Sequence, residues 1–139
     1  MRRAVRGALG LATIGTMAGM ALAAEKPPAE YQNVMKGLGA AQMSLRNNLT
    51  SKSYEGVAKD AVAIKASLRA AEQFWTTRKV QDAINFAKAG LKGATDLETA
   101  ANAKNDEGIA AAQKAIGGAC MGCHTAHRER LPDGTFEIK

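Results

Sequence analysis

Both cysteines of the chain stand in one short run, Cys120–His124, which reads C-M-G-C-H. The spacing C-x-x-C-H is the attachment signal of c-type haem. On a helix, positions i, i+3 and i+4 lie on one face, so Cys120, Cys123 and His124 would point the same way. The thiols can add to the two vinyl groups of a porphyrin while the imidazole reaches its iron. We therefore expect one covalently bound haem c, with His124 as an iron ligand.

Other uses of these residues are less well supported by their spacing. A disulfide between Cys120 and Cys123 would close a very short loop and stabilise little. A thioredoxin-like redox pair follows a strand and sits at a helix N-terminus, whereas Cys120 falls about four turns into its expected helix. A zinc site with His127 as fourth ligand is too compact, because four ligands on one helical stripe cannot surround a tetrahedral ion.

The elements that must position the motif are four stretches with apolar residues at helical spacing. Each stretch spans about 20 to 25 residues, or about 30 Å as a helix. Only a few residues connect one stretch to the next, which places sequential helices antiparallel. We predict an all-α fold, an antiparallel up-and-down four-helix bundle. The stretches are Ala29–Leu49, Tyr54–Trp75, Arg78–Ala101 and Asp106–Arg130.

Local signals mark the expected ends of these helices. Ser51 or Ser53 can cap the second, Thr77 the third and Asn105 the fourth. After Arg130, residues 131–134 favour a turn, and residues 135–139 alternate briefly as a strand would.

The expected core is short of large apolar side chains. Aromatic residues make up 4% of the chain, and the helical stripes consist mainly of alanine and leucine. A porphyrin held by the motif would face this interior and supply the missing volume.

The first 23 residues have the layout of a secretory signal peptide. Three arginines precede an apolar stretch, which ends in the small-x-small pattern Ala21-Leu22-Ala23. We expect cleavage there, a mature chain of residues 24–139 in the periplasm, and no membrane association after cleavage. Removing the three arginines lowers the net charge from +6 to +3. The remaining basic residues form no run with interleaved aromatics, so nucleic acid is not an expected partner.

A C-x-x-C-H motif near the end of an exported helical chain resembles the cytochrome c prime family, the class II c-type cytochromes. The resemblance covers Ala29–Arg130. It implies that Arg128, at the family's basic position after the motif, lies beside the haem. His127 stands where relatives carry an aromatic residue, and we expect it to be a solvated surface side chain. Tyr31 replaces an arginine that relatives often place near the haem propionates. Members of the family often form homodimers.

The first helix separates the two subclasses of this family. Low-spin members place a methionine there as sixth iron ligand, in a context like Met-Lys-x-x-Gly, and the run Met35–Gly39 is similar. The resemblance therefore implies His124 and Met35 as the axial ligands. Met43 lies eight positions further on, rotated by about 80° from Met35, and Met121 is held in the motif. The alternative for Met35 is an ordinary core residue.

These features favour a one-electron carrier over an enzyme. The sequence offers no paired carboxylates, no nucleophile with a base and no phosphate loop. An iron with two protein ligands would pass electrons to redox partner proteins through small, transient interfaces. The alternative is a five-coordinate, high-spin protein that binds nitric oxide or carbon monoxide, which requires that Met35 is not a ligand. A third interpretation is an exported thiol oxidoreductase without haem.

Overall fold

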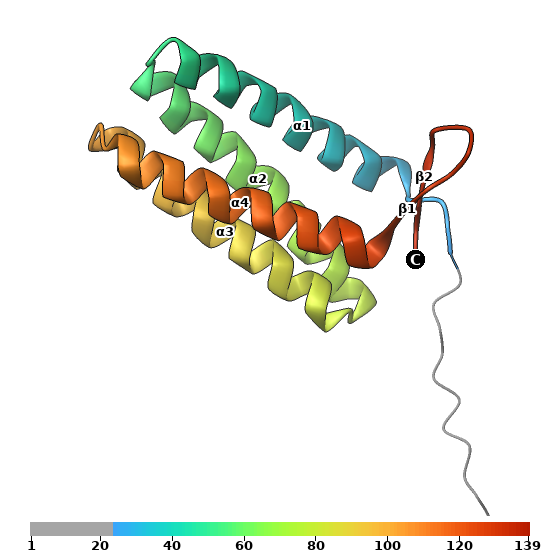
Figure 1. Ribbon diagram of the computed structural model, residues 1–139. Helices are drawn as coiled ribbons and strands as arrows, with labels where there is room; N and C mark the ends of the chain where they lie inside the picture. Colours follow the sequence, from blue (N-terminus) through green and yellow to red (C-terminus); the bar gives the residue numbers. More distant parts are fainter. Residues whose placement is uncertain (1–23) are drawn as a thin grey trace, which may run out of the picture.

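The computed structural model describes residues 24–139, which form four long helices and a short C-terminal hairpin (Figure 1). The expected signal peptide, residues 1–23, lies outside the described residues. The helices are α1 (Ala29–Thr50), α2 (Tyr54–Arg78), α3 (Gln81–Asn102) and α4 (Asp106–His127).

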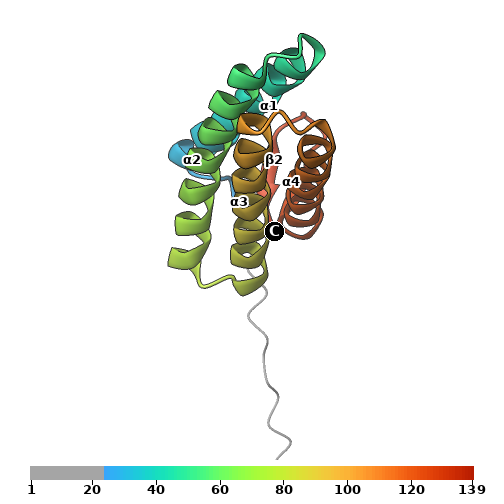
Figure 2. The ribbon, with the colours of Figure 1, turned by 90° about the vertical axis from the view of Figure 1, so that its left-hand side faces the viewer.

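The helices run up and down with short connections, which confirms the predicted all-α, four-helix class. Close packing joins sequential helices: α1 with α2, α2 with α3, and α3 with α4 (Figures 1 and 2). By contrast, α1 and α4 do not pack along each other, although they would be neighbours in a closed bundle. The bundle is therefore open along one side.

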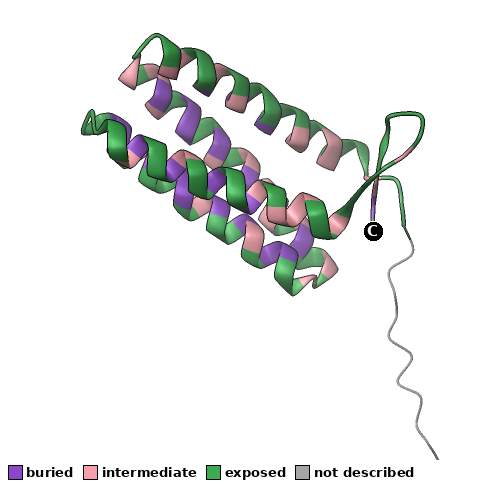
Figure 3. Cartoon of the chain, viewed as in Figure 1, coloured by how far each residue is buried: buried purple, intermediate pink, exposed green. Residues whose placement is uncertain are grey.

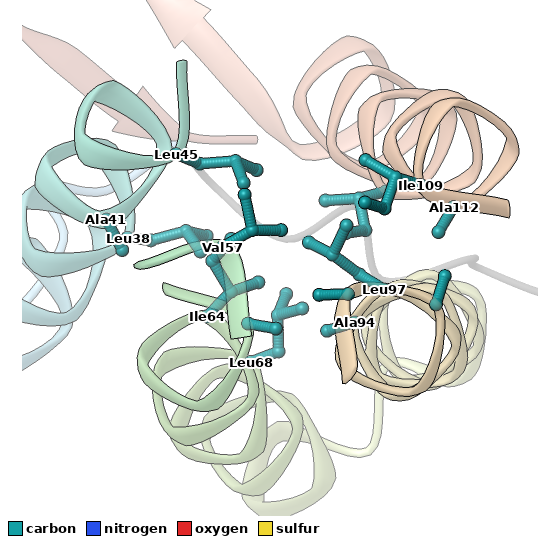
Figure 4. Close-up of a cluster of buried hydrophobic side chains, with 14 residues drawn as sticks. Leu38, Ala41, Leu45, Val57, Ile64, Leu68, Ala94, Leu97, Ile109 and Ala112 are labelled. Carbon is teal, nitrogen blue, oxygen red and sulfur yellow. The ribbon is translucent and has the colours of Figure 1, made fainter. Parts of the chain in front are cut away.

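All four helices contribute to the main hydrophobic core (Figure 4). Its members include Leu38 and Leu45 of α1, Val57 of α2, Leu97 of α3 and Ile109 of α4. Burying each such side chain contributes about 1.5–3 kcal/mol to folding. A second, smaller cluster lies near the end of α2 and joins Trp75, Ala83, Ile84 and Ile138.

Burial is uneven among the helices (Figure 3). Seven residues of α2 and nine of α3 are buried, but only three of α1 and four of α4. In α1 the first buried residue is Leu38, and in α4 the last is Ala119. The N-terminal turns of α1 and the C-terminal turns of α4 carry Met35 and the C-x-x-C-H motif. None of their residues is fully buried, although Met35 and Cys120 pack against the core.

Two of the predicted helix caps are confirmed and one is wrong. The Ser53 and Asn105 side chains accept hydrogen bonds from backbone N–H groups at 3.2 and 3.0 Å. Thr77 does not cap the third helix, because α2 continues to Arg78 and the Thr77 hydroxyl donates to the Gln73 carbonyl. The third helix begins at Gln81 rather than at Arg78.

The fourth helix ends three residues earlier than predicted. Arg128 is extended (φ −129°, ψ 131°) and begins strand β1 (Arg128–Arg130), which pairs antiparallel with β2 (Phe136–Ile138). Pro132 restricts only Leu131, the residue before it, and therefore does not explain why the helix ends at His127. The backbone groups of Arg128–Arg130 pair with strand β2 instead of forming hydrogen bonds within the helix.

Candidate cofactor-binding cleft

A cleft of about 790 Å³ lies between α1 and α4, on the open side of the bundle. This volume is within the range of ordinary small-molecule and cofactor sites, about 300–1,000 Å³. All five residues that the sequence predicts for a cofactor site line this cleft. They are Met35, Cys120, Cys123, His124 and Arg128.

The C-x-x-C-H motif forms one wall of the cleft, on the last two turns of α4. Cys120, Cys123 and His124 are half-buried, and both cysteines are free thiols. The helical spacing therefore brings two sulfurs and one imidazole to the same cavity, as their i, i+3 and i+4 positions require. The Gln42 amide of α1 approaches the Cys120 sulfur at 4.0 Å from across the cleft.

Burial favours the neutral forms of these groups. Burial raises the pKa of the Cys120 thiol. Burial, with smaller contributions from the nearby Cys120 and Asp82, raises the pKa of Cys123 to about 11. Burial and the Arg128 charge lower the pKa of His124. A disulfide-exchange enzyme needs the opposite, a lowered thiol pKa. A neutral imidazole is the form that binds a metal ion.

The opposite wall of the cleft is α1. Met35 is half-buried there and packs against the main core, whereas Met43 lines the same cleft with 66% of its surface exposed. Tyr31, one turn before Met35, accepts a hydrogen bond of 3.0 Å from the Trp75 indole. Of the two methionines that line the cleft, Met35 is therefore the more buried and the one that contacts the core.

Glycines on both walls leave room for a flat group. Gly39 of α1 and Gly117 of α4 both line the cleft, and a Cβ atom added to either would meet no other atom within 4 Å. The volume of this cleft, its largely apolar lining and its two thiols are compatible with a porphyrin.

The rim of the cleft is positively charged. Its exposed cations are Lys26, Lys36, Arg46 and Arg128, and none forms an ion pair with another residue in the range 24–139. Glu137 is the acidic residue among the lining groups. Such a rim suits a cofactor that carries carboxylates. Of these four cations, the sequence predicts only Arg128 as a residue beside the cofactor. The Arg128 guanidinium lies 4.3 Å from the centre of the Phe136 ring, which holds it beside the hairpin.

His127 is not the solvated surface residue that the sequence suggests. Only 11% of its side chain is exposed, and its Nε2 lies 2.9 Å from an Asp82 carboxylate oxygen. Its ring centre is 5.1 Å from that of Trp75. The reason is that the last turn of α4 lies over the first turn of α3, where Asp82 projects. Because Asp82 is 45 residues from His127, the sequence around His127 does not indicate this contact.

Gly122, inside the motif, is required by close packing against α3. A Cβ atom there would lie 2.4 Å from the Phe86 ring. We expect Gly122→Ala to lower the free energy of unfolding by about 1–2 kcal/mol, because overpacking costs about 1–3 kcal/mol and exceeds the gain in helix propensity. In a Phe86→Ala background the same substitution should instead stabilise by up to about 1 kcal/mol. Urea denaturation of the four proteins measures both effects.

Gly118→Ala is the matched control for this cycle. A Cβ atom at this neighbouring helical position meets nothing within 4 Å. The substitution should therefore raise the free energy of unfolding by about 0.5–1 kcal/mol. Equal effects of Gly118→Ala and Gly122→Ala would show that contact with Phe86 does not constrain the motif.

Comparisons with known proteins add no assignment to this geometry. No family model matches the chain, and the searches of curated proteins and of solved structures returned no significant match. Within residues 24–139, none of the helices has an apolar stretch long enough to cross a membrane.

Proposed function

We propose that this protein is a periplasmic, monohaem c-type cytochrome of the cytochrome c prime kind, and that it acts as a one-electron carrier. Cys120 and Cys123 would hold the haem covalently, and His124 and Met35 would be its axial ligands. The observation that carries the proposal is the cleft itself. Two thiols and a neutral imidazole on one wall face a methionine-bearing wall across a cavity of about 790 Å³.

The haem would supply a one-electron iron couple, and the chain supplies its attachment and surroundings. The two thiols would fix the haem to α4, and Met35 and Leu38 of α1 would exclude water from its other side. The positively charged rim would suit the haem carboxylates. A metal centre with both axial positions taken by protein has no open position for a substrate. Methionine and histidine ligation also raises the potential relative to other axial pairs. These features favour electron exchange with redox partner proteins.

The basic rim also bears on how such partners would meet the protein. The net charge of the mature chain is only +3, but four cations on the cleft rim have no ion-pair partner among residues 24–139. A cleft lined by one sign of charge raises the encounter rate with an oppositely charged partner.

The second candidate is a five-coordinate cytochrome that binds nitric oxide or carbon monoxide. The space beside Gly39 on the α1 wall favours it, since a small ligand could be accommodated there. In this case Met35 would be a packing residue, and the iron would keep one open position.

The electronic spectrum of the exported protein tests the proposal. We expect low-spin bands in both oxidation states, a weak sulfur-to-iron charge-transfer band in the oxidised state, and reversible one-electron reduction. A high-spin spectrum that changes on adding carbon monoxide would support the gas-binding alternative. A colourless exported protein that reduces disulfides would overturn both.

A further inference from the structure

The C-terminal hairpin joins the two walls of the cleft. Near Tyr31 and His127, where α1 and α4 do not pack along each other, a small sheet connects them (Figures 1 and 2). Glu25, just before α1, exchanges two backbone hydrogen bonds with Ile138 of β2, at 2.9 and 2.8 Å. Strand β2 pairs with β1, and β1 continues directly from α4.

The sheet is anchored to the bundle by side chains as well. Ile138 is 5% exposed and packs into the second core cluster with Trp75 and Ile84. The Glu25 carboxylate forms an ion pair with Arg78 at the end of α2. These contacts fix the segment before α1 and the end of the chain to the same corner of the bundle.

The same sheet forms the end wall of the cleft. Lys26 and Pro27 line the cleft from the segment before α1, and residues 135–138 line it from the hairpin. The tail is therefore part of the cavity surface, although the sequence suggests only a turn followed by a short alternating stretch.

We propose that the hairpin is a strap that closes this end of the cofactor cleft and holds the α1 wall at a fixed distance from the Cys–His wall. Ile138 is its main positioning residue, since its burial anchors β2 and its backbone holds Glu25. The start of α1 is held on one side by α2, where Tyr31 accepts a hydrogen bond from Trp75, and on the other side by this anchor, because the adjacent end of α4 does not pack along it. The inference rests on the proposed function only for the identity of the group in the cleft.

Amide hydrogen exchange of the cofactor-free chain, residues 24–139, tests the strap without reference to haem. In Ile138→Ala we expect exchange in residues 29–38 to rise at least about tenfold, while residues 41–50 of the same helix stay close to wild type. Tenfold corresponds to about 1.4 kcal/mol, less than the usual cost of an isoleucine-to-alanine change in a core. Ile138→Val should retain most of the protection.

Ile109→Ala is the matched control. Ile109 is equally well buried, at 3% exposed, but lies in the first turn of α4, far from the hairpin. This variant should lose comparable global stability without selective exchange at the start of α1. Unchanged exchange at residues 29–38 in Ile138→Ala, or a uniform rise over all four helices, would overturn the strap. A chain that never carries haem would refute the proposed function and leave this result standing.

Discussion

Replacing both motif cysteines by alanine is expected to abolish covalent attachment of the cofactor. Cys120 and Cys123 are the two cysteines of the chain, so no other thiol can form a thioether bond. When the exported double variant is treated with acid acetone, all remaining pigment should be extracted from the polypeptide. In the wild type, the pigment should stay with the protein.

Met121→Ala provides the matched control for this experiment. Met121 lies between the cysteines with 68% of its surface exposed, so its side chain contributes little to the cleft. This variant should keep its pigment after extraction, as the wild type does. Pigment that resists extraction in the double cysteine variant would contradict the assignment of the two thiols.

Met35→Leu is expected to convert the protein from low spin to high spin. Leucine retains the approximate volume and the packing against the core but removes the sulfur, so the fold should persist. The sulfur-to-iron charge-transfer band should disappear completely, the reduction potential should fall, and carbon monoxide should bind to the reduced protein. Absorption spectra of the oxidised, reduced and carbon monoxide-treated variant measure these changes.

Met43→Leu separates ligation from a general effect of changing α1. Both methionines line the cleft from the same helix, but Met43 is 66% exposed. Its replacement should leave the spectrum unchanged. If Met43→Leu abolished the charge-transfer band and Met35→Leu did not, the proposed sixth ligand would be wrong.

The helices could be predicted from the sequence because their signals are local. The apolar stripe from Tyr54 to Trp75 and the caps Ser53 and Asn105 depend on residues within one or two turns. Thr77 shows the limit of such signals. It is a good capping residue by type, but the second helix continues past it to Arg78, and Lys79 then turns the chain in a left-handed conformation (φ 58°).

The cleft could be predicted only in part. The C-x-x-C-H spacing and the shortage of large core residues indicate which helix faces a large apolar group. The separation of α1 from α4 cannot be read from either helix alone, since both carry ordinary amphipathic patterns. The rim cations Lys36 and Arg46 come together with Arg128 only through the fold.

The end of the chain was the least predictable part. The predicted turn at residues 131–134 and the predicted strand within residues 135–139 are confirmed. Arg128–Arg130 continue a helical stretch in the sequence, however, and their pairing with β2 has no local signal. His127 acquires its partner Asp82 from another helix for the same reason. Contacts between residues distant in the sequence determine both features.

The intact mass of the protein, after export from cells with a working haem-ligation apparatus, tests the central claim most directly. We expect a mass greater than that of the polypeptide by about 616 Da, the mass of one haem. The increase should persist under denaturing conditions because the thioether bonds are covalent. A mass equal to that of the polypeptide alone, with both cysteines still free to react with an alkylating reagent, would contradict it.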